Sequence, residues 1–273
     1  MMGNIIEIIK ALILGVIQGI TEWLPISSTG HLILAEHWMP FKLSAAFIST
    51  FFVVIQVGSI LAVVLLFFNK LNPFSPKKDE KQRHDTLILW SKILVASVPA
   101  AIIGLLFNEM IDKYLYTPLV VAATLILFAV AILWVERRNK KPSITSFGQI
   151  SYKTAALIGG FQVLALIPGT SRSGATILGA ILLGSSRVIA SEFSFFMAIP
   201  VMLGAGGLKL LKAGFAFSGI EWLVLLTGFA TAFVVSLFAI RFLLKYIRSH
   251  DFTVFAYYRI ALAVVVLTLL FVK

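Results

Sequence analysis

Long apolar stretches dominate the chain and limit what it can fold into. Six of them, at about 47–68, 87–107, 117–135, 190–211, 220–240 and 252–272, approach the roughly 20 helical residues that cross a bilayer core. Composition agrees, because 59% of the residues are hydrophobic and 13% are charged, which leaves too few polar side chains to cover a soluble domain of 273 residues. We expect an all-α, polytopic membrane protein that forms a single membrane domain over residues 1–273.

Two further apolar regions are interrupted by turn-forming and hydroxyl residues. The first turn is Leu24-Pro25-Ile26-Ser27-Ser28-Thr29-Gly30-His31, and the second turn is Ile167-Pro168-Gly169-Thr170-Ser171-Arg172-Ser173-Gly174. The segment 173–184 would extend about 18 Å as a helix, roughly half of a ~30 Å core. Irregular backbone at that depth is tolerated where it is buried in protein or lines a watery cavity. We predict that each turn lies between two half-helices in a re-entrant hairpin that borders a site.

The two turns resemble each other. Pro25 aligns with Pro168, and Ser28 with Ser171, both at an offset of 143 residues. We therefore expect two repeats, each with one re-entrant hairpin and three transmembrane helices, at about 1–140 and 145–273. Because three crossings is an odd number, the second repeat would be inverted, and the two hairpins would enter from opposite faces and meet near the midplane.

The basic residues indicate an orientation. In this topology fifteen lysines and arginines fall on one side and six on the other, which assigns the first side to the cytoplasm and both termini to the outside. This asymmetry accounts for most of the net charge of +11, so we expect no nucleic-acid partner. The absence of cysteine excludes disulfides and cysteine nucleophiles. The N-terminal stretch 5–24 has no basic n-region or cleavage site, so we interpret it as mature protein.

The second turn has the composition of an anion-binding loop. It supplies the guanidinium of Arg172, the hydroxyls of Ser171, Ser173 and Thr176, and glycines, followed at once by a predicted helix. A helix N-terminus offers unpaired amides and a positive dipole end, and arginine can bind phosphate oxygens through two hydrogen bonds. The alternative is structural: a hydroxyl caps the helix and Arg172 extends to the interface.

The first turn carries candidate nucleophiles and bases. Gln18 and Glu22 share a helix face that leads into it, and it contains Ser28 and His31. Its other two hydroxyl residues, Ser27 and Thr29, are expected to bind the substrate phosphate. A serine or histidine can attack phosphorus when a base activates it, and a carboxylate can hold a divalent ion. Alone, the same residues could be a helix start and a structural histidine. Pairing with an anion-binding turn favours a site that hydrolyses a lipid diphosphate.

Two other residues each allow two interpretations, and a pair of glycines allows one. Glu192 either supports the site or complements a helix N-terminus. Arg259 either supports the site or extends to the headgroups. Gly15 and Gly19 lie four residues apart, a spacing typical of close helix packing.

At these motifs the sequence closely resembles the undecaprenyl-diphosphatase family, the bacterial bacitracin-resistance proteins, over essentially its whole length. The family's Glu/Gln-x-x-x-Glu pattern is matched by Gln18 to Glu22, which leads into the first turn. Its Pro-Gly-x-Ser-Arg-Ser-x-x-Thr pattern is matched by Pro168 to Thr176. Gln18 supplies no second carboxylate, and Phe52 stands where some relatives are expected to carry an acid.

The resemblance implies a multi-pass phosphatase of the bacterial plasma membrane that converts undecaprenyl diphosphate to the monophosphate, with its site open to the outside. It implies a divalent cation, Mg²⁺ or Ca²⁺, with Glu22 as its candidate ligand. Glu22, Ser28, His31 and Arg172 are the expected catalytic residues, and whether Ser28 or His31 is the nucleophile stays open. A homodimer is also left open.

Two other functions remain in view. A transporter or flippase for an anionic polyprenyl lipid would use Glu22 and Arg172 for binding only, since inverted repeats with broken helices are also a transporter design. A structural scaffold would leave the buried polar groups unexplained.

Overall fold

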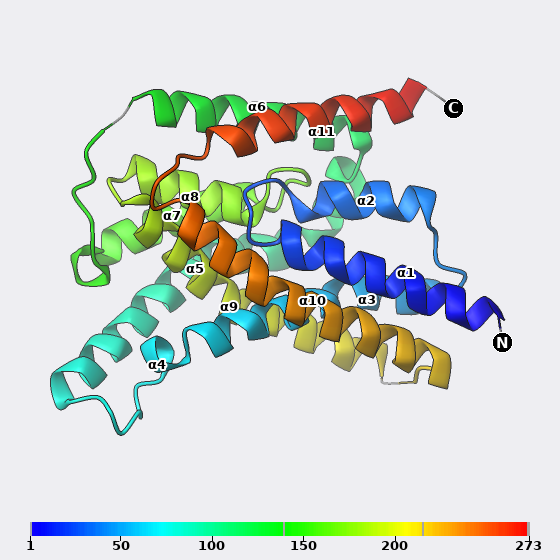
Figure 1. The fold of residues 1–273 in the computed structure, drawn as a ribbon, viewed down its shortest axis with the longest axis horizontal. Coiled ribbons are helices and arrows are strands. Elements are labelled where there is room, and N and C mark those ends of the chain that lie inside the picture. The colour runs from blue at the N-terminus through cyan, green and yellow to red at the C-terminus, as the bar shows by residue number, and fades with distance from the viewer. Residues whose placement is uncertain (1, 139, 215, 272–273) are drawn as a thin grey trace.

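The computed structural model describes residues 2–138, 140–214 and 216–271, and these residues form a helical bundle (Figure 1). The first turn of the N-terminal helix and the last turn of the C-terminal helix lie at the same end of the bundle. In chain order the helices are α1 (Met2–Thr21), α2 (Ser28–Trp38), α3 (Ala45–Leu66), the short α4 (Phe68–Leu71), α5 (Glu80–Leu115), α6 (Pro118–Arg137), the 3₁₀ turn η1 (Phe147–Gln149), α7 (Tyr152–Leu164), α8 (Arg172–Leu182), α9 (Arg187–Ala213), α10 (Gly219–Tyr246) and α11 (Thr253–Phe271).

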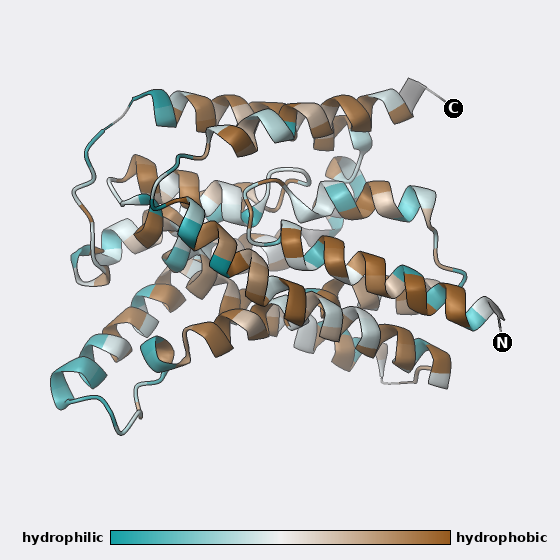
Figure 2. Ribbon diagram, viewed as in Figure 1, coloured by the Kyte–Doolittle hydropathy of each residue, from teal (hydrophilic) through white to brown (hydrophobic). Residues whose placement is uncertain are grey.

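Six of these helices are long and apolar enough to cross a membrane: α1, α3, α5, α6, α9 and α10. Their apolar lengths and polar ends are visible in Figure 2. Five of the six coincide with predicted spans, so the expectation of an all-helical, polytopic membrane protein is confirmed. The sixth predicted span, 252–272, is α11, whose apolar part Thr253–Leu269 is shorter than the others.

Helix α1 differs from the expected half-helix. It is continuous for 20 residues, which corresponds to about 30 Å at 1.5 Å per residue. The reason is local, because no proline interrupts the apolar sequence before Pro25. After the first turn, α2 runs back toward the end of the bundle from which α1 came (Figure 1).

Both turns are completed by a serine in a strained conformation. Ser27 has φ 72° and Ser171 has φ 73°, and within the described ranges they are the only non-glycine residues with positive φ. Each serine is the N-cap of an 11-residue helix and accepts a hydrogen bond from the amide three residues on, that of Gly30 or Gly174. The residue equivalent to Ser171 is therefore Ser27, 144 residues earlier, and the predicted alignment with Ser28 is wrong by one residue.

Glycines allow α1 to approach α10 closely. A Cβ atom at Gly15 would lie 2.7 Å from the carbonyl oxygen of Gly228, and one at Gly19 would lie 2.7 Å from Cβ of Val235. The close packing expected for these two glycines is confirmed. This contact holds the last turns of α1, and with them Gln18 and Glu22, against the rest of the bundle.

Aromatic side chains surround the region where the two turns meet. Trp23, directly before the first turn, is fully buried and packs edge-on against Phe195 of α9, with ring centroids 5.1 Å apart. Phe193 and Phe196 of the same helix are also fully buried. The N-terminal half of α9 therefore forms a rigid apolar wall beside the polar turns.

Candidate active site

The carboxylate of Glu22 is the centre of a buried polar cluster. Glu22 follows the last residue of α1 and is only 5% exposed. Its Oε2 accepts hydrogen bonds from Gln18 Nε2 at 2.9 Å and from the hydroxyl of Ser28 at 3.1 Å. The four-residue spacing of Gln18 and Glu22 thus places both side chains on one helix face, as predicted, and the face is directed at the first residue of α2.

Arg172 joins the second turn to this carboxylate. Its Nη2 lies 3.3 Å from Oε1 of Glu22, across 150 residues of sequence. Its Nη1 donates to the carbonyl oxygen of Ser194 at 2.8 Å, and its guanidinium lies over the ring of Trp23 at 5.6 Å. The two turns therefore converge on one site, with an acid and a guanidinium in contact.

Several polar atoms in and beside this cluster have no protein partner. The side chains of Arg172 and Glu22 are 11% and 5% exposed, so their charges are costly unless they are compensated. Yet Nε of Arg172, Oε1 of Gln18 and Nε1 of Trp23 are buried without a hydrogen bond. Buried polar groups are seldom left unpaired, so these atoms are candidates to bind a ligand or water.

Two of the predicted phosphate-binding hydroxyls connect the turns to each other. Ser173 Oγ lies 3.1 Å from the carbonyl oxygen of Glu22 and 3.2 Å from that of Leu24. Thr176 donates to the carbonyl oxygen of Arg172 at 2.8 Å and lies 2.6 Å from the hydroxyl of Ser194. Both residues are buried. Ser173 therefore ties the second turn to the backbone around the first, and Thr176 contacts Arg172 and Ser194.

The accessible face of the site is formed by the first residues of α2 and α8. Ser28, Thr29, His31, Ser171 and Arg172 are all partly exposed, whereas Ser27 is 1% exposed. These residues lie at two helix N-termini, where the first amides have no intrahelical acceptor and the dipole is positive. The arrangement can therefore receive a strongly negative group between the two helix ends.

His31 is held by two hydrogen bonds. Its Nδ1 lies 2.7 Å from the carbonyl oxygen of Ser27, and its Nε2 lies 2.7 Å from the hydroxyl of Tyr258, whose ring stacks on the imidazole at 5.5 Å. A carbonyl can only accept, so Nδ1 carries the proton, and in the neutral ring Nε2 accepts from Tyr258. The unprotonated nitrogen of His31 is thus paired with Tyr258. No motif in the sequence predicts this contact of Tyr258 with His31.

Arg259 supports both turns from below. It is fully buried and donates to the carbonyl oxygens of Pro25 at 3.2 Å, Gly169 at 2.9 Å and Thr170 at 3.0 Å, and also to two carbonyls of α6. No carboxylate of the described residues forms an ion pair with it. Of the two interpretations of Arg259, support of the site is correct, and extension to the headgroups is wrong.

Glu192 lies apart from the cluster. Its carboxylate forms an ion pair with Lys70 at 2.6 Å, and among the described residues no hydrogen bond or ion pair joins it to Glu22 or Arg172. The residue of α9 that contacts the cluster is Ser194. A role of Glu192 in supporting the site therefore stays a prediction.

The residues present fit a divalent cation only in part. Within the described ranges no group of three or more acidic or histidine side chains is placed to hold a metal. Glu22 offers one carboxylate and Gln18 an unpartnered buried amide oxygen, while Arg172 lies 3.3 Å from the same carboxylate. Mg²⁺ commonly binds one or two carboxylates and completes its shell with waters and substrate phosphates. The site fits such an ion when the substrate supplies the remaining oxygens.

Comparison with known proteins gives a consistent result. Residues 11–265 match the family model described as bacitracin resistance protein BacA. The chain is 56% identical over 268 residues to undecaprenyl-diphosphatase 1 of Clostridioides difficile (strain 630), covering 98% of each chain. It is 54% identical over 268 residues to an undecaprenyl-diphosphatase of Enterococcus faecalis, covering 97% of each. The chain therefore belongs to the bacitracin resistance protein BacA family.

Proposed function

We infer that this protein is a membrane enzyme that hydrolyses undecaprenyl diphosphate to undecaprenyl phosphate and phosphate, which recycles the lipid carrier of cell-wall synthesis. Relatives more than 50% identical over nearly the whole chain are named for this activity. The observation that carries the proposal is the contact of Glu22 with both Ser28 and Arg172, at 3.1 and 3.3 Å. A nucleophile, a base and an anion-binding cation lie together, as phosphoryl transfer requires.

In the proposed reaction Ser28 attacks the terminal phosphorus. Its Oγ forms the new bond to phosphorus, its proton passes to Glu22, and the bond from phosphorus to the bridging oxygen breaks, so that undecaprenyl phosphate leaves. Water then cleaves the phosphoserine: its oxygen bonds to phosphorus, the bond from phosphorus to Oγ breaks, and Glu22 returns its proton to Oγ. Phosphate leaves with the protons of the water, while His31, held between Ser27 and Tyr258, fixes the turn that carries Ser28. Arg172 and the amides at the two helix N-termini neutralise the phosphoryl oxygens throughout.

The hydrogen bond of Ser28 to the carboxylate favours it over His31 as the nucleophile, because the ring of His31 is already held between Ser27 and Tyr258. Direct attack by His31 remains the alternative. The two routes differ in the covalent intermediate, which would be an acid-stable phosphoserine or an acid-labile phosphohistidine.

We further propose that a divalent cation, Mg²⁺ or Ca²⁺, accompanies the substrate. When bound, it would neutralise negative charge on the diphosphate oxygens. Glu22 and the amide oxygen of Gln18 would hold it. Phosphate release should then fall when a chelator is added and recover with excess Mg²⁺ or Ca²⁺.

The proposed placement in the membrane follows the repeat hypothesis. The equal lengths of α2 and α8, and the equivalent caps Ser27 and Ser171, support two related units, and the repeat hypothesis gives these units opposite orientations. In this arrangement the two turns meet inside the plasma membrane, both termini and the mouth of the site face outside, and the polyprenyl tail lies along the apolar helices. Inverted units alone would also suit a transporter for the same lipid, and the relatives named for diphosphatase activity favour the hydrolase.

The decisive experiment measures phosphate release from undecaprenyl diphosphate by purified protein in detergent. The wild-type protein should release phosphate. The kcat of Ser28→Ala should be at least about 100-fold lower, as expected when a key catalytic group is lost. Ser49→Ala, which removes an exposed hydroxyl on α3, is the matched control and should retain full activity. Wild type that releases no phosphate, or equal activity in the two variants, would overturn the proposal.

A further inference from the structure

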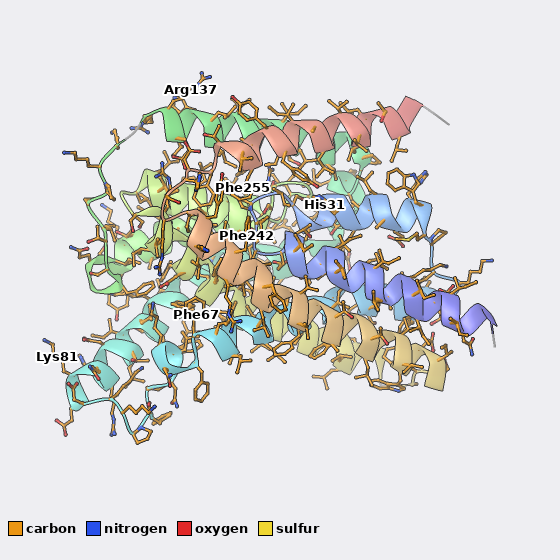
Figure 3. All side chains as sticks on the ribbon, viewed as in Figure 1. His31, Phe67, Lys81, Arg137, Phe242 and Phe255 are labelled. Atoms are coloured by element: carbon orange, nitrogen blue, oxygen red, sulfur yellow. The ribbon has the colours of Figure 1, made fainter. Side chains whose placement is uncertain are left out.

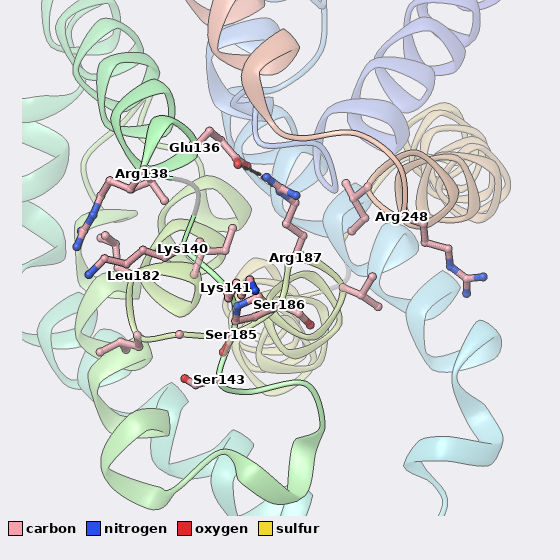
Figure 4. A pocket seen from close by; sticks show the side chains of 17 residues that line it. Glu136, Arg138, Lys140, Lys141, Ser143, Leu182, Ser185, Ser186, Arg187 and Arg248 are labelled. Atoms are coloured by element: carbon pink, nitrogen blue, oxygen red, sulfur yellow. Dashed lines mark hydrogen bonds and ion pairs between the residues drawn. The ribbon is translucent and has the colours of Figure 1, made fainter.

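A cavity lies away from the two turns, at the end of the bundle where α6, α8, α9 and α10 come together (Figure 4). Its volume is about 680 Å³, and its lining includes none of the polar residues around Glu22. Five cationic side chains and one carboxylate line it, a net of four positive charges: Arg138, Lys140, Lys141, Arg187, Arg248 and Glu136. The chemistry of the proposed reaction makes no use of this cavity.

The floor of the cavity is built from two loops that are hydrogen-bonded to each other. The amides of Ser143 and Ile144 both donate to the carbonyl oxygen of Gly184 at 2.9 Å, and the amide of Ser186 donates to Ile144 at 2.8 Å. A side chain at Gly184 would meet the hydroxyl of Ser143, since a Cβ there would lie 2.4 Å from it, and φ at Gly184 is +99°. The floor is therefore preformed.

A buried hydroxyl in this floor has no partner. Ser185 lines the cavity and is only 3% exposed, yet its Oγ makes no hydrogen bond to protein. A buried hydroxyl without a partner is unfavourable unless something else binds it. The next residue, Ser186, is the N-cap of the 27-residue helix α9, whose positive dipole end is at the cavity. Both features favour an anion on the floor.

The only carboxylate among the lining residues is already neutralised. Glu136 accepts hydrogen bonds from Nε of Arg187 at 3.1 Å and from the amide of Phe252 at 3.1 Å. Figure 4 shows Arg187 directed at Glu136, with Arg138 and Arg248 on opposite sides of the rim. The lysines and rim arginines therefore keep an uncompensated positive charge around the floor.

The remaining lining is apolar, which distinguishes the cavity from a site for a small inorganic ion. Leu182, Leu183, Val188 and Ile247 contribute to it, and Trp134, 55% exposed one turn from the rim, stacks with Arg138 at 4.7 Å. Exposed tryptophan beside arginine is typical of the membrane interface. Basic pockets between transmembrane helices bind anionic lipid headgroups.

We propose that this cavity binds one anionic phospholipid from the leaflet on the side that carries most lysines and arginines, which the sequence assigns to the cytoplasm. The lipid phosphate lies over Ser185 and the start of α9, Lys140 and Lys141 close over it, and an acyl chain runs along Leu182 and Ile247. The proposal is independent of the hydrolysis reaction.

Native mass spectrometry of the detergent-purified full chain tests it. The protein is titrated with phosphatidylglycerol or with phosphatidylcholine of the same acyl chains. Lys140→Glu/Lys141→Glu reverses two rim charges, and Lys77→Glu/Lys81→Glu makes the same change of charge on exposed lysines at the same end of the bundle, where Figure 3 labels Lys81. Ser185→Ala removes the unpartnered hydroxyl with little change in volume.

Wild type and Lys77→Glu/Lys81→Glu should retain one phosphatidylglycerol in preference to phosphatidylcholine. Affinity should fall about tenfold or more in Lys140→Glu/Lys141→Glu, on the scale of lost lysine contacts to anionic lipid, and severalfold in Ser185→Ala. Phosphate release should be unchanged in all variants. If both charge reversals weaken phosphatidylglycerol binding equally, the attraction is diffuse. If millimolar inorganic phosphate displaces the lipid, the cavity is a site for free phosphate. Either result overturns the proposal. If the pocket double variant does not fold, undiminished binding by Ser185→Ala would contradict it.

Discussion

At the scale of single residues, the site depends on a buried pair of opposite charges. Burying the charges of Glu22 and Arg172 costs solvation free energy. Their contact at 3.3 Å offsets this cost only in part, because Nε of Arg172 has no hydrogen-bond partner. A bound diphosphate would supply acceptors for that nitrogen and for the helix N-termini. The site without substrate therefore keeps a buried donor unpaired, and an anion that binds there would satisfy it.

Arg172 should matter for the transition state more than for folding. Arg172→Ala is expected to lower kcat for phosphate release by on the order of 100-fold or more, as the loss of one preorganised charge donor does elsewhere. Arg137→Ala, at an exposed position at the end of α6 labelled in Figure 3, should leave kcat unchanged. Steady-state kinetics of the two purified variants checks this, and similar rates for both would contradict it.

Tyr258 should act through His31. Tyr258→Phe keeps the stacked ring but removes the hydroxyl that donates to Nε2 at 2.7 Å, so kcat should fall severalfold, the worth of one hydrogen bond. His31→Ala should fall much further. In the double variant the Tyr258→Phe change should have no additional effect, because its partner is gone. An undiminished effect in the His31→Ala background would show that Tyr258 acts elsewhere.

At the scale of elements, each turn is held in a conformation that its own sequence disfavours. Ser27 and Ser171 have positive φ without being glycine, which costs of order 1 to 3 kcal/mol and persists only when surrounding contacts fix it. Arg259 supplies such contacts, because it donates to carbonyl oxygens of the first turn, the second turn and α6. The geometry of the site is therefore maintained by residues outside it.

Replacing Arg259 should destabilise both turns together. Arg259→Met is expected to lower the unfolding temperature and abolish phosphate release, because it leaves several buried carbonyl groups without a donor, at about 1 to 3 kcal/mol each. Arg259→Lys should recover part of the stability. Thermal unfolding in detergent measures both, and an Arg259→Met protein as stable as wild type would exclude this role.

Gly169 allows the second turn to contact α6. Gly169→Ala places a Cβ 2.2 Å from Oγ1 of Thr124 and at φ +87°, so the unfolding temperature should fall, by the equivalent of roughly 1 to 3 kcal/mol. Gly160→Ala is the control in α7, where a Cβ meets nothing within 4 Å and alanine is the better helix former. That variant should be as stable as wild type or more so. A harmless Gly169→Ala change would contradict the account of this turn.

Much of this architecture could be predicted from the sequence, and the remainder could not for physical reasons. The length of the apolar stretches predicts the membrane spans. The charged residues Glu22 and Arg172, which are unusual in apolar surroundings, predict the polar cluster. Ser27 follows Pro25 by two residues, whereas Ser171 follows Pro168 by three. This difference of one residue made the equivalence of Ser27 and Ser171 unpredictable from the sequence. Contacts such as Tyr258 with His31, or Glu192 with Lys70, join residues more than 100 positions apart and leave no local pattern.

At the scale of the whole molecule, two polar centres are embedded in an apolar bundle. One joins the turns between α1 and α2 and between α7 and α8, and the other is the basic cavity at the end of α6. The cluster around Glu22 has a serine hydroxyl paired with a carboxylate, whereas the cavity combines positive charge with apolar walls. This division predicts that changes in the cavity alter lipid binding and leave turnover intact.

The central claim is that the two turns act as one catalytic unit, and a double-mutant cycle tests it most directly. The rate of phosphate release from undecaprenyl diphosphate is measured for wild type, Glu22→Gln, Arg172→Lys and the double variant. Residues that act as a unit are strongly non-additive, so we predict that the double variant is little slower than the slower single variant. If the two losses in kcat multiply, the residues act independently and the account is wrong.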